Sequence, residues 1–196
     1  MNRRELLTQL ALAAGGTLVS AVAEAALRGA ALHVPPAQSA LQPLERELVR
    51  QLAELILPRT DTPGAIDAGV PAFIDQIVSN WYSPQEREIF REGLASLDVF
   101  CRQAWSRPFT ECDPEQQTKA LSAAEDSSRG YEETSGRRIR DVPDEQSPFF
   151  YKLKLLTVLG YYTSEVGSTQ ELSYDPVPGK YDGDLDFETV GRQWSW

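Results

Sequence analysis

Apolar side chains recur at helical spacing along five stretches of the chain, which is typical of helices with one buried face. The clearest stretch places Leu44, Leu48 and Leu52 on one face, and Pro58 ends it. The pattern predicts helices over residues 43–57, about 70–81, about 84–105, about 114–126 and about 147–166. The last of these is apolar nearly all round, so we expect it to be deeply buried or covered by another surface.

Residues with helix-start and helix-stop preferences flank these stretches. Pro71 suits the first turn of the second helix. Ser83 and Glu86 have the spacing of a capping box before the third helix, and Asp113 precedes the fourth. Gly167 stands where a C′ glycine would end the fifth helix.

Two segments show no regular period. Residues 127–146 are polar and predict a connector, whose basic run 137–140 would face solvent or dock on an acidic patch. Residues 168–196 mix prolines and glycines with scattered aromatic residues, which predicts a long irregular arm that packs on the domain or on a partner. The predicted fold is therefore all-α, a compact bundle of about five helices over residues 43–167 with an irregular C-terminal arm.

The N-terminus has the organisation of an export signal. Arg3 and Arg4 precede a weakly apolar stretch, residues 6–23, and an Ala-x-Ala cleavage site follows. Paired arginines before such a stretch favour the twin-arginine route, which exports folded proteins. Residues 1–25 are thus predicted to be the signal and residues 26–42 a flexible leader. An amphipathic helix with two unrelated arginines, or an uncleaved anchor, is the alternative.

Composition narrows the chemistry that the chain could carry. Of its 196 residues, 41% are hydrophobic and 24% are charged, which is ordinary for a folded protein. A formal net charge of −10 argues against nucleic-acid binding, which needs a basic surface. The single histidine, His33 in the leader, and only two cysteines argue against zinc sites, iron–sulfur clusters and imidazole-based catalysis.

Motifs that would indicate a cofactor or metal are also missing. The sequence contains neither a nucleotide-phosphate loop nor a covalent haem motif. Residues 182–186 alternate carboxylates that could hold calcium, but they lack the order of an EF-hand loop, so a solvated acidic turn is the preferred interpretation. Glycosidase-like paired carboxylates stay open, because nothing in the sequence selects a pair. We expect no catalytic, cofactor or metal site in this chain.

The two cysteines, Cys101 and Cys112, stand near the end of the predicted third helix and in the loop that follows. Export to an oxidising compartment would favour a disulfide between them. A bond from Cys112 to a partner chain, or two free thiols, are the alternatives.

Several stretches taken together carry a family resemblance. They are Leu55-Ile56-Leu57-Pro58-Arg59-Thr60-Asp61-Thr62-Pro63-Gly64-Ala65, Ala68-Gly69-Val70-Pro71-Ala72-Phe73-Ile74-Asp75, Phe149-Phe150, Leu153-Lys154, the run 157–167 and Tyr174-Asp175-Pro176-Val177-Pro178-Gly179-Lys180-Tyr181. The combined pattern, over about residues 45–185, resembles the gluconate 2-dehydrogenase subunit 3 family. A twin-arginine leader is typical of that family.

The resemblance implies a small, non-catalytic subunit of a membrane-associated periplasmic dehydrogenase for sugars or sugar acids. Its large partner would be a flavoprotein of the glucose-methanol-choline type that holds the FAD, and a cytochrome c would often take the electrons onward. The small subunit would act as an escort, or chaperone, that supplies the export signal at Arg3 and Arg4 to the twin-arginine translocase. This non-catalytic role agrees with the absence of catalytic, cofactor and metal motifs from the sequence.

For the contact with the partner we favour the loop after the first helix, the end of the fifth helix and the aromatic start of the arm. The residues are Thr60, Asp61, Thr62, Pro63, Gly64, Tyr161, Tyr162, Glu165, Tyr174, Pro176, Pro178, Gly179 and Tyr181. Aromatic anchors of this kind dominate the energies of protein interfaces. Alternatively, Tyr161 and Tyr162 belong to the core and the arm covers its own helices.

Two other functions stay open from the sequence alone. A stand-alone carboxylate-based enzyme acting on carbohydrate would show turnover as a single purified chain. An acidic docking module for an electron-transfer cytochrome would bind that cytochrome in a salt-dependent way without a flavoprotein.

Overall fold

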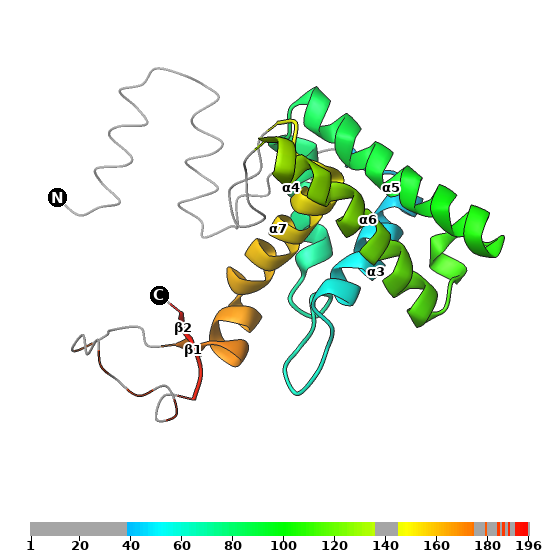
Figure 1. Ribbon diagram of the computed structural model, residues 1–196. Coiled ribbons are helices and arrows are strands. Elements are labelled where there is room, and N and C mark those ends of the chain that lie inside the picture. The colour runs from blue at the N-terminus through cyan, green and yellow to red at the C-terminus, as the bar shows by residue number, and fades with distance from the viewer. Residues whose placement is uncertain are drawn as a thin grey trace, which may run out of the picture. The chain divides into compact units, whose positions relative to one another are not determined.

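Figure 1 shows the computed structural model of the chain, whose described residues fall within the unit Gln38–Trp196. The structure describes residues 39–135, 145–174, 179, 184, 186, 188 and 191–195. The predicted signal segment, residues 26–38 of the predicted leader and the basic run 137–140 therefore lie outside the described residues.

Five α-helices make up most of the described residues, which confirms the all-α class. They are α3 (Pro43–Ile56), α4 (Val70–Asn80), α5 (Pro84–Trp105), α6 (Pro114–Ser135) and α7 (Phe149–Tyr162). A 3₁₀ turn, Phe109–Glu111, lies between α5 and α6, and a π-helical turn, Gly167–Glu171, follows α7. The predicted bounds of α3, α4 and α5 agree with the structure to within one residue.

Side-chain caps explain where α5 and α6 begin. Ser83 Oγ accepts the Glu86 N–H at 3.2 Å, and Glu86 Oε2 accepts the Ser83 N–H at 3.0 Å, so the predicted capping box is confirmed. Asp113 and Gln116 make the same reciprocal pair at the start of α6. Ser106 then ends α5 in the left-handed conformation, with φ of 57°.

The core is organised around α7, which packs against each of the other four helices. α5 and α6 run side by side as an antiparallel pair (Figure 1). Apolar side chains from all five helices and from the 3₁₀ turn fill the space between the helices, and the fully buried ones include Leu52, Ile74, Phe90, Leu94, Phe109 and Leu153. These contacts hold α7 against the other four helices, and the candidate site lies at its C-terminal end.

The connector predicted over residues 127–146 is wrong in its first part, because α6 continues to Ser135. Ser128 is buried, and its hydroxyl donates to the Ala124 carbonyl at 2.8 Å within the helix. The Tyr131 ring lies 6.4 Å from the Tyr151 ring of α7. Packing against α7 thus extends helix α6 into a polar segment whose sequence has little helical periodicity of its own.

The end predicted for the fifth helix is also wrong, because α7 ends at Tyr162 and not near Gly167. Gly167 does not take the left-handed conformation of a C′ glycine but begins the π-helical turn, which the Leu172 N–H closes on the Gly167 carbonyl at 3.1 Å. The chain then forms β1 (Ser173–Tyr174), which pairs in parallel with β2 (Trp194–Ser195). The two described strands of the predicted arm therefore pair with each other.

Candidate functional site

A cleft of about 500 Å³ lies at the C-terminal end of α7. Its walls come from the loop between α3 and α4 (residues 57–66), the last turn of α7, the π-helical turn and residues 191–193. Its lining includes side chains that can form hydrogen bonds, among them those of Thr60, Asp61, Thr62, Tyr162, Glu171 and Arg192. Segments far apart in the sequence therefore meet here.

Two hydrogen bonds join loop 57–66 to the end of α7 and to the π-helical turn that follows it. The Tyr161 hydroxyl donates to the Pro63 carbonyl at 2.7 Å, and the Thr62 hydroxyl donates to Glu171 Oε2 at 2.6 Å. Tyr161 itself is buried, and its burial is the main influence that raises its pKa. The hydroxyl therefore keeps its proton at neutral pH and can donate to the loop.

The Glu54 carboxylate of α3 holds both ends of the same loop. Its Oε1 accepts the Arg59 N–H at 3.0 Å, and its Oε2 accepts the Ile66 N–H at 2.9 Å. A Cβ at Gly64 would overlap this carboxylate and would lie 2.6 Å from the Arg59 nitrogen. Only glycine fits this position without a shift of the loop.

Asp67 supports the loop from its far end. It accepts a hydrogen bond from the Arg59 guanidinium and one from the Gly64 N–H at 3.1 Å. The Arg59 contact is the main influence that lowers the pKa of Asp67. The sequence analysis missed Glu54 and Asp67 because an acidic residue on a helix or in a turn carries no distinguishing motif.

The structure brings together most of the predicted contact residues that it describes. Thr60, Asp61 and Thr62 line the cleft with Tyr161 and Tyr162. Glu165 is exposed beyond the end of α7 and does not line the cleft, Tyr174 belongs to β1, and Gly179 is exposed. Pro176, Pro178 and Tyr181 lie outside the described residues. The role of all these residues in binding stays a prediction.

An exposed apolar stripe runs along α7 up to the cleft. We define the α7 stripe as Leu155, Val158, Leu159 and Tyr162, which share one face because they are spaced three or four residues apart. Leu155 is half-buried, whereas the other three are exposed, Leu159 by 45%. The helix that the sequence marks as apolar nearly all round is thus buried on one side only.

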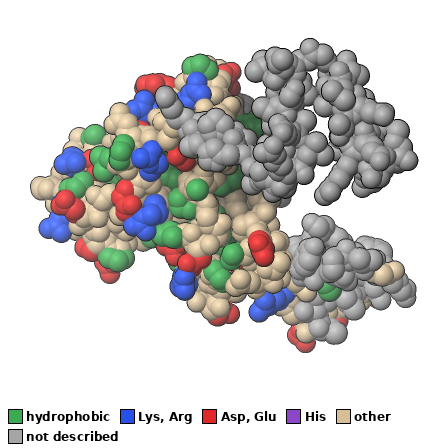
Figure 2. Space-filling view, turned by 180° about the vertical axis from the view of Figure 1, so that it is seen from behind, with side chains coloured by type: hydrophobic (Ala, Val, Ile, Leu, Met, Phe, Trp, Pro, Cys, Tyr) green, Lys and Arg blue, Asp and Glu red, His purple; other side chains and the backbone are tan. Residues whose placement is uncertain are grey.

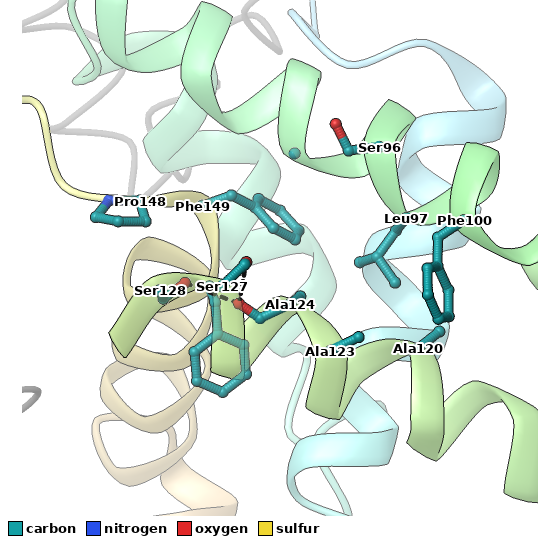
Figure 3. A pocket seen from close by; sticks show the side chains of 12 residues that line it. Ser96, Leu97, Phe100, Ala120, Ala123, Ala124, Ser127, Ser128, Pro148 and Phe149 are labelled. Carbon is teal, nitrogen blue, oxygen red and sulfur yellow. Dashed lines mark hydrogen bonds between the residues drawn. The ribbon is translucent and has the colours of Figure 1, made fainter. Parts of the chain in front are cut away.

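A second hollow, an apolar groove of about 330 Å³, lies between α5, α6 and the start of α7. Figure 3 shows Ala120, Ala123 and Ala124 along α6, with Phe149 and Phe100 on either side of the space that they border. Its lining residues carry no titratable side chain. The groove therefore has no group for acid–base chemistry or metal binding.

The surface carries no single-sign patch on the face that Figure 2 shows. Among its described residues, Lys and Arg are interspersed with Asp and Glu and with hydrophobic side chains. Within the same described part of the chain, no group of three or more His, Cys, Asp or Glu residues could hold a metal ion. Asp184 and Asp186 are described, but the rest of the predicted acidic turn and His33 are not.

Cys101 and Cys112 are both buried, and the structure holds them as free thiols. Both belong to one buried apolar cluster, and Cys112 is among the neighbours that raise the pKa of Cys101. The two residues are therefore neighbours in space, as a disulfide between them would require.

A family model described as Gluconate 2-dehydrogenase subunit 3 matches residues 43–179. The chain belongs to this family. The match covers all five α-helices and loop 57–66. The α7 stripe and every wall of the cleft except residues 191–193 therefore fall within the matched region. No curated protein and no solved structure matches the chain.

Membership in the gluconate 2-dehydrogenase subunit 3 family identifies the chain as a subunit of a dehydrogenase complex, associated with other subunits. Among the residues that the structure describes, no helix is both long and apolar enough to cross a membrane. The candidate site of this subunit consists of the cleft, the hydrogen-bonded loop 57–66 and the adjoining α7 stripe.

Proposed function

We propose that this chain is a non-catalytic accessory subunit that binds the catalytic flavoprotein of a sugar or sugar-acid dehydrogenase and escorts it out of the cytoplasm. The observation that carries the proposal is the family match over residues 43–179. The partner would be of the glucose-methanol-choline type with FAD bound, and a cytochrome c would receive the electrons. The assembled enzyme would work in the periplasm, associated with the membrane through the complex.

The α7 stripe supports a binding role. Leucine, valine and tyrosine side chains on one exposed helix face are costly to leave in water, and their burial by a partner would be favourable. Tyr162 lies at the end of the stripe and also lines the cleft. A partner that covers the stripe would therefore also reach loop 57–66.

The cleft adds directional contacts to this surface. Loop 57–66 is held by Glu54, Asp67 and Tyr161 before any partner arrives, so little conformational freedom would be lost on binding. Asp61 and Glu171 give the cleft two carboxylates beside aromatic rings. A basic side chain of the partner would suit this chemistry.

Export is the second part of the proposal. Arg3 and Arg4 would direct the folded pair to the twin-arginine translocase. Replacing both by Lys should leave the chain and the flavoprotein together inside the cell. If the flavoprotein still reached the periplasm at its normal level, the escort part of the proposal would be wrong.

The test of the binding role compares two Asp substitutions on exposed leucines. Leu159 in the α7 stripe is 45% exposed, and Leu44 on α3 is 55% exposed, so Leu44→Asp is a matched control. Each variant of the full chain is affinity-purified from cells that express the dehydrogenase, and the co-purified flavoprotein is quantified. Because both sites are exposed, both substitutions should change the stability of the chain by less than about 1 kcal/mol.

We expect Leu159→Asp to reduce the recovered flavoprotein at least tenfold and Leu44→Asp to leave it unchanged, since an unpaired charge buried in an interface costs more than about 1.4 kcal/mol. Equal recovery with all three chains would show that the α7 stripe is not the interface. Absence of any flavoprotein with the wild-type chain would contradict the accessory role itself.

A further inference from the structure

The corner between α5 and α6 holds two buried thiols that belong to one apolar cluster. Cys101 lies in the last turns of α5 and is fully buried, whereas Cys112 directly follows the 3₁₀ turn and is 8% exposed. The Cys112 thiol donates to the Pro108 carbonyl at 3.4 Å, and the Phe109 N–H, three residues before Cys112, donates to the carboxylate of Asp98, three residues before Cys101. The fold therefore keeps the two cysteines near each other on either side of the loop that turns the chain from α5 to α6.

We propose that Cys101 and Cys112 are a modification site at which a protein disulfide oxidises the folded chain to an internal disulfide. Thiols that the fold holds near each other need little rearrangement to form the bond. The oxidant is named by class: a dithiol–disulfide protein of an oxidising compartment.

The reaction proceeds by two exchange steps. The Cys112 thiolate attacks one sulfur of the oxidant's disulfide, which forms a mixed disulfide and releases the oxidant's other sulfur as a thiolate. Cys101 then gives up its proton and attacks the Cys112 sulfur, which releases the oxidant as a dithiol. Two thiols of this chain are oxidised, one disulfide of the oxidant is reduced, and two electrons and two protons are transferred.

The different burial of the two thiols sets the order of these steps. Burial is the main influence that raises the pKa of Cys101 to about 12, and contact with Cys112 and the charge of Asp98 add to it. Cys101 is thus almost never a thiolate in the reduced chain, and it has no exposure to an external oxidant. Cys112, at 8% exposed, is the more accessible of the two thiols, so the oxidant reacts there first and Cys101 acts on the mixed disulfide from inside the fold.

The bond would stabilise the place where three helices meet. The Phe109 N–H donates to Asp98 Oδ1 of α5 at 2.9 Å, and the Phe109 carbonyl accepts the Gln117 amide of α6 at 3.1 Å. The same Gln117 amide donates to Gln51 of α3 at 3.1 Å. For a short loop of this kind, the oxidised chain should unfold about 6–12 °C higher than the reduced chain.

The experiment has one arm in cells and one in solution. Full-length chain is recovered from the exported fraction and, as the Arg3→Lys/Arg4→Lys variant, from inside the cell; each sample is unfolded in N-ethylmaleimide and its intact mass is measured. In solution, the purified reduced chain is mixed with an oxidised dithiol–disulfide oxidoreductase, and its melting temperature is compared before and after reduction. Cys112→Ser is the control, because it retains Cys101 and cannot close the bond.

We expect the exported chain to take up no maleimide and to be two hydrogens lighter, and the retained variant to take up two. In solution the wild type should lose both reactive thiols and gain the stated melting temperature, whereas Cys112→Ser should change in neither respect. Two maleimide adducts on the wild type after treatment with the oxidoreductase would overturn the proposal. That arm needs no export and no partner, so its failure is distinguishable from failure of the proposed function.

Discussion

Replacing Glu86 by Gln should destabilise the fold more than replacing Lys152 by Met, although both changes remove the same ion pair. Lys152 Nζ of α7 lies 3.2 Å from Glu86 Oε1 of α5 and 5.3 Å from the centre of the Tyr82 ring. The Lys152 side chain is 1% exposed, whereas that of Glu86 is 20% exposed. The two charges therefore differ in their access to water once the other has gone.

The magnitude follows from this difference in burial. Glu86→Gln retains a capping-box side chain at Ser83 but takes a charged partner away from the Lys152 ammonium, whose side chain is 1% exposed, and this should cost about 3 kcal/mol. Lys152→Met leaves a carboxylate that still accepts the Ser83 N–H and partly reaches water, which should cost about 1 kcal/mol. The double variant, with no charge at either position, should resemble Lys152→Met.

Urea or thermal unfolding of the full-length chain measures these differences. At about 2–4 °C per kcal/mol for a chain of this size, Glu86→Gln should lower the melting temperature by about 6–12 °C and Lys152→Met by about 2–4 °C. An equal or larger loss for Lys152→Met would refute the reasoning, because it would show that the buried ammonium does not depend on Glu86.

The same pair predicts a pH dependence. Burial alone would raise the pKa of Glu86, but the Ser83 N–H and the Lys152 ammonium together lower it below its ordinary value. The ionised carboxylate therefore contributes stability above its unfolded pKa of about 4.3, and this contribution is lost as the pH falls through the lower folded value. The difference in unfolding free energy between wild type and Glu86→Gln should shrink over that acidic range and stay constant near neutral pH.

Two further substitutions test the packing and the cleft. Gly93→Ala adds a Cβ that would overlap the Cβ and Cγ atoms of Phe149. The overlap should cost about 1–3 kcal/mol, more than the gain in helix propensity of at most about 1 kcal/mol, so the melting temperature should fall. A melting temperature above that of the wild type would contradict the close contact of α5 with α7. Tyr161→Phe removes the hydrogen bond to the Pro63 carbonyl and should lower the free energy of unfolding by about 1 kcal/mol. It should also make loop 57–66 easier for a protease to cleave. An unchanged cleavage rate would show that Tyr161 does not hold the loop.

Local signals were sufficient to predict where the helices begin. Ser83, Glu86 and Asp113 satisfy backbone N–H groups within one turn, so their effect can be read without knowing the rest of the fold. The extension of α6 to Ser135 could not be predicted in this way. It depends on Ser128 and Tyr131 lying against α7, a contact between residues far apart in the sequence.

The candidate site was predictable only in part. The sequence pointed to the loop with Thr60 and Thr62 and to Tyr161, and the structure places them around one cleft. It gave no sign of Glu54 or Asp67, whose roles come from hydrogen bonds to backbone groups of a folded loop. Which face of α7 is exposed was also unpredictable, because a helix that is apolar nearly all round has no polar face to mark the solvent side.

The central claim is that this chain binds a flavin-containing dehydrogenase subunit. Its most direct test is the absorption spectrum and subunit composition of the full-length chain when it is affinity-purified from its own cells without dissociating conditions. We predict flavin absorption bands and a co-purifying large subunit in a fixed ratio to the chain. A chain that elutes alone and colourless would contradict the account.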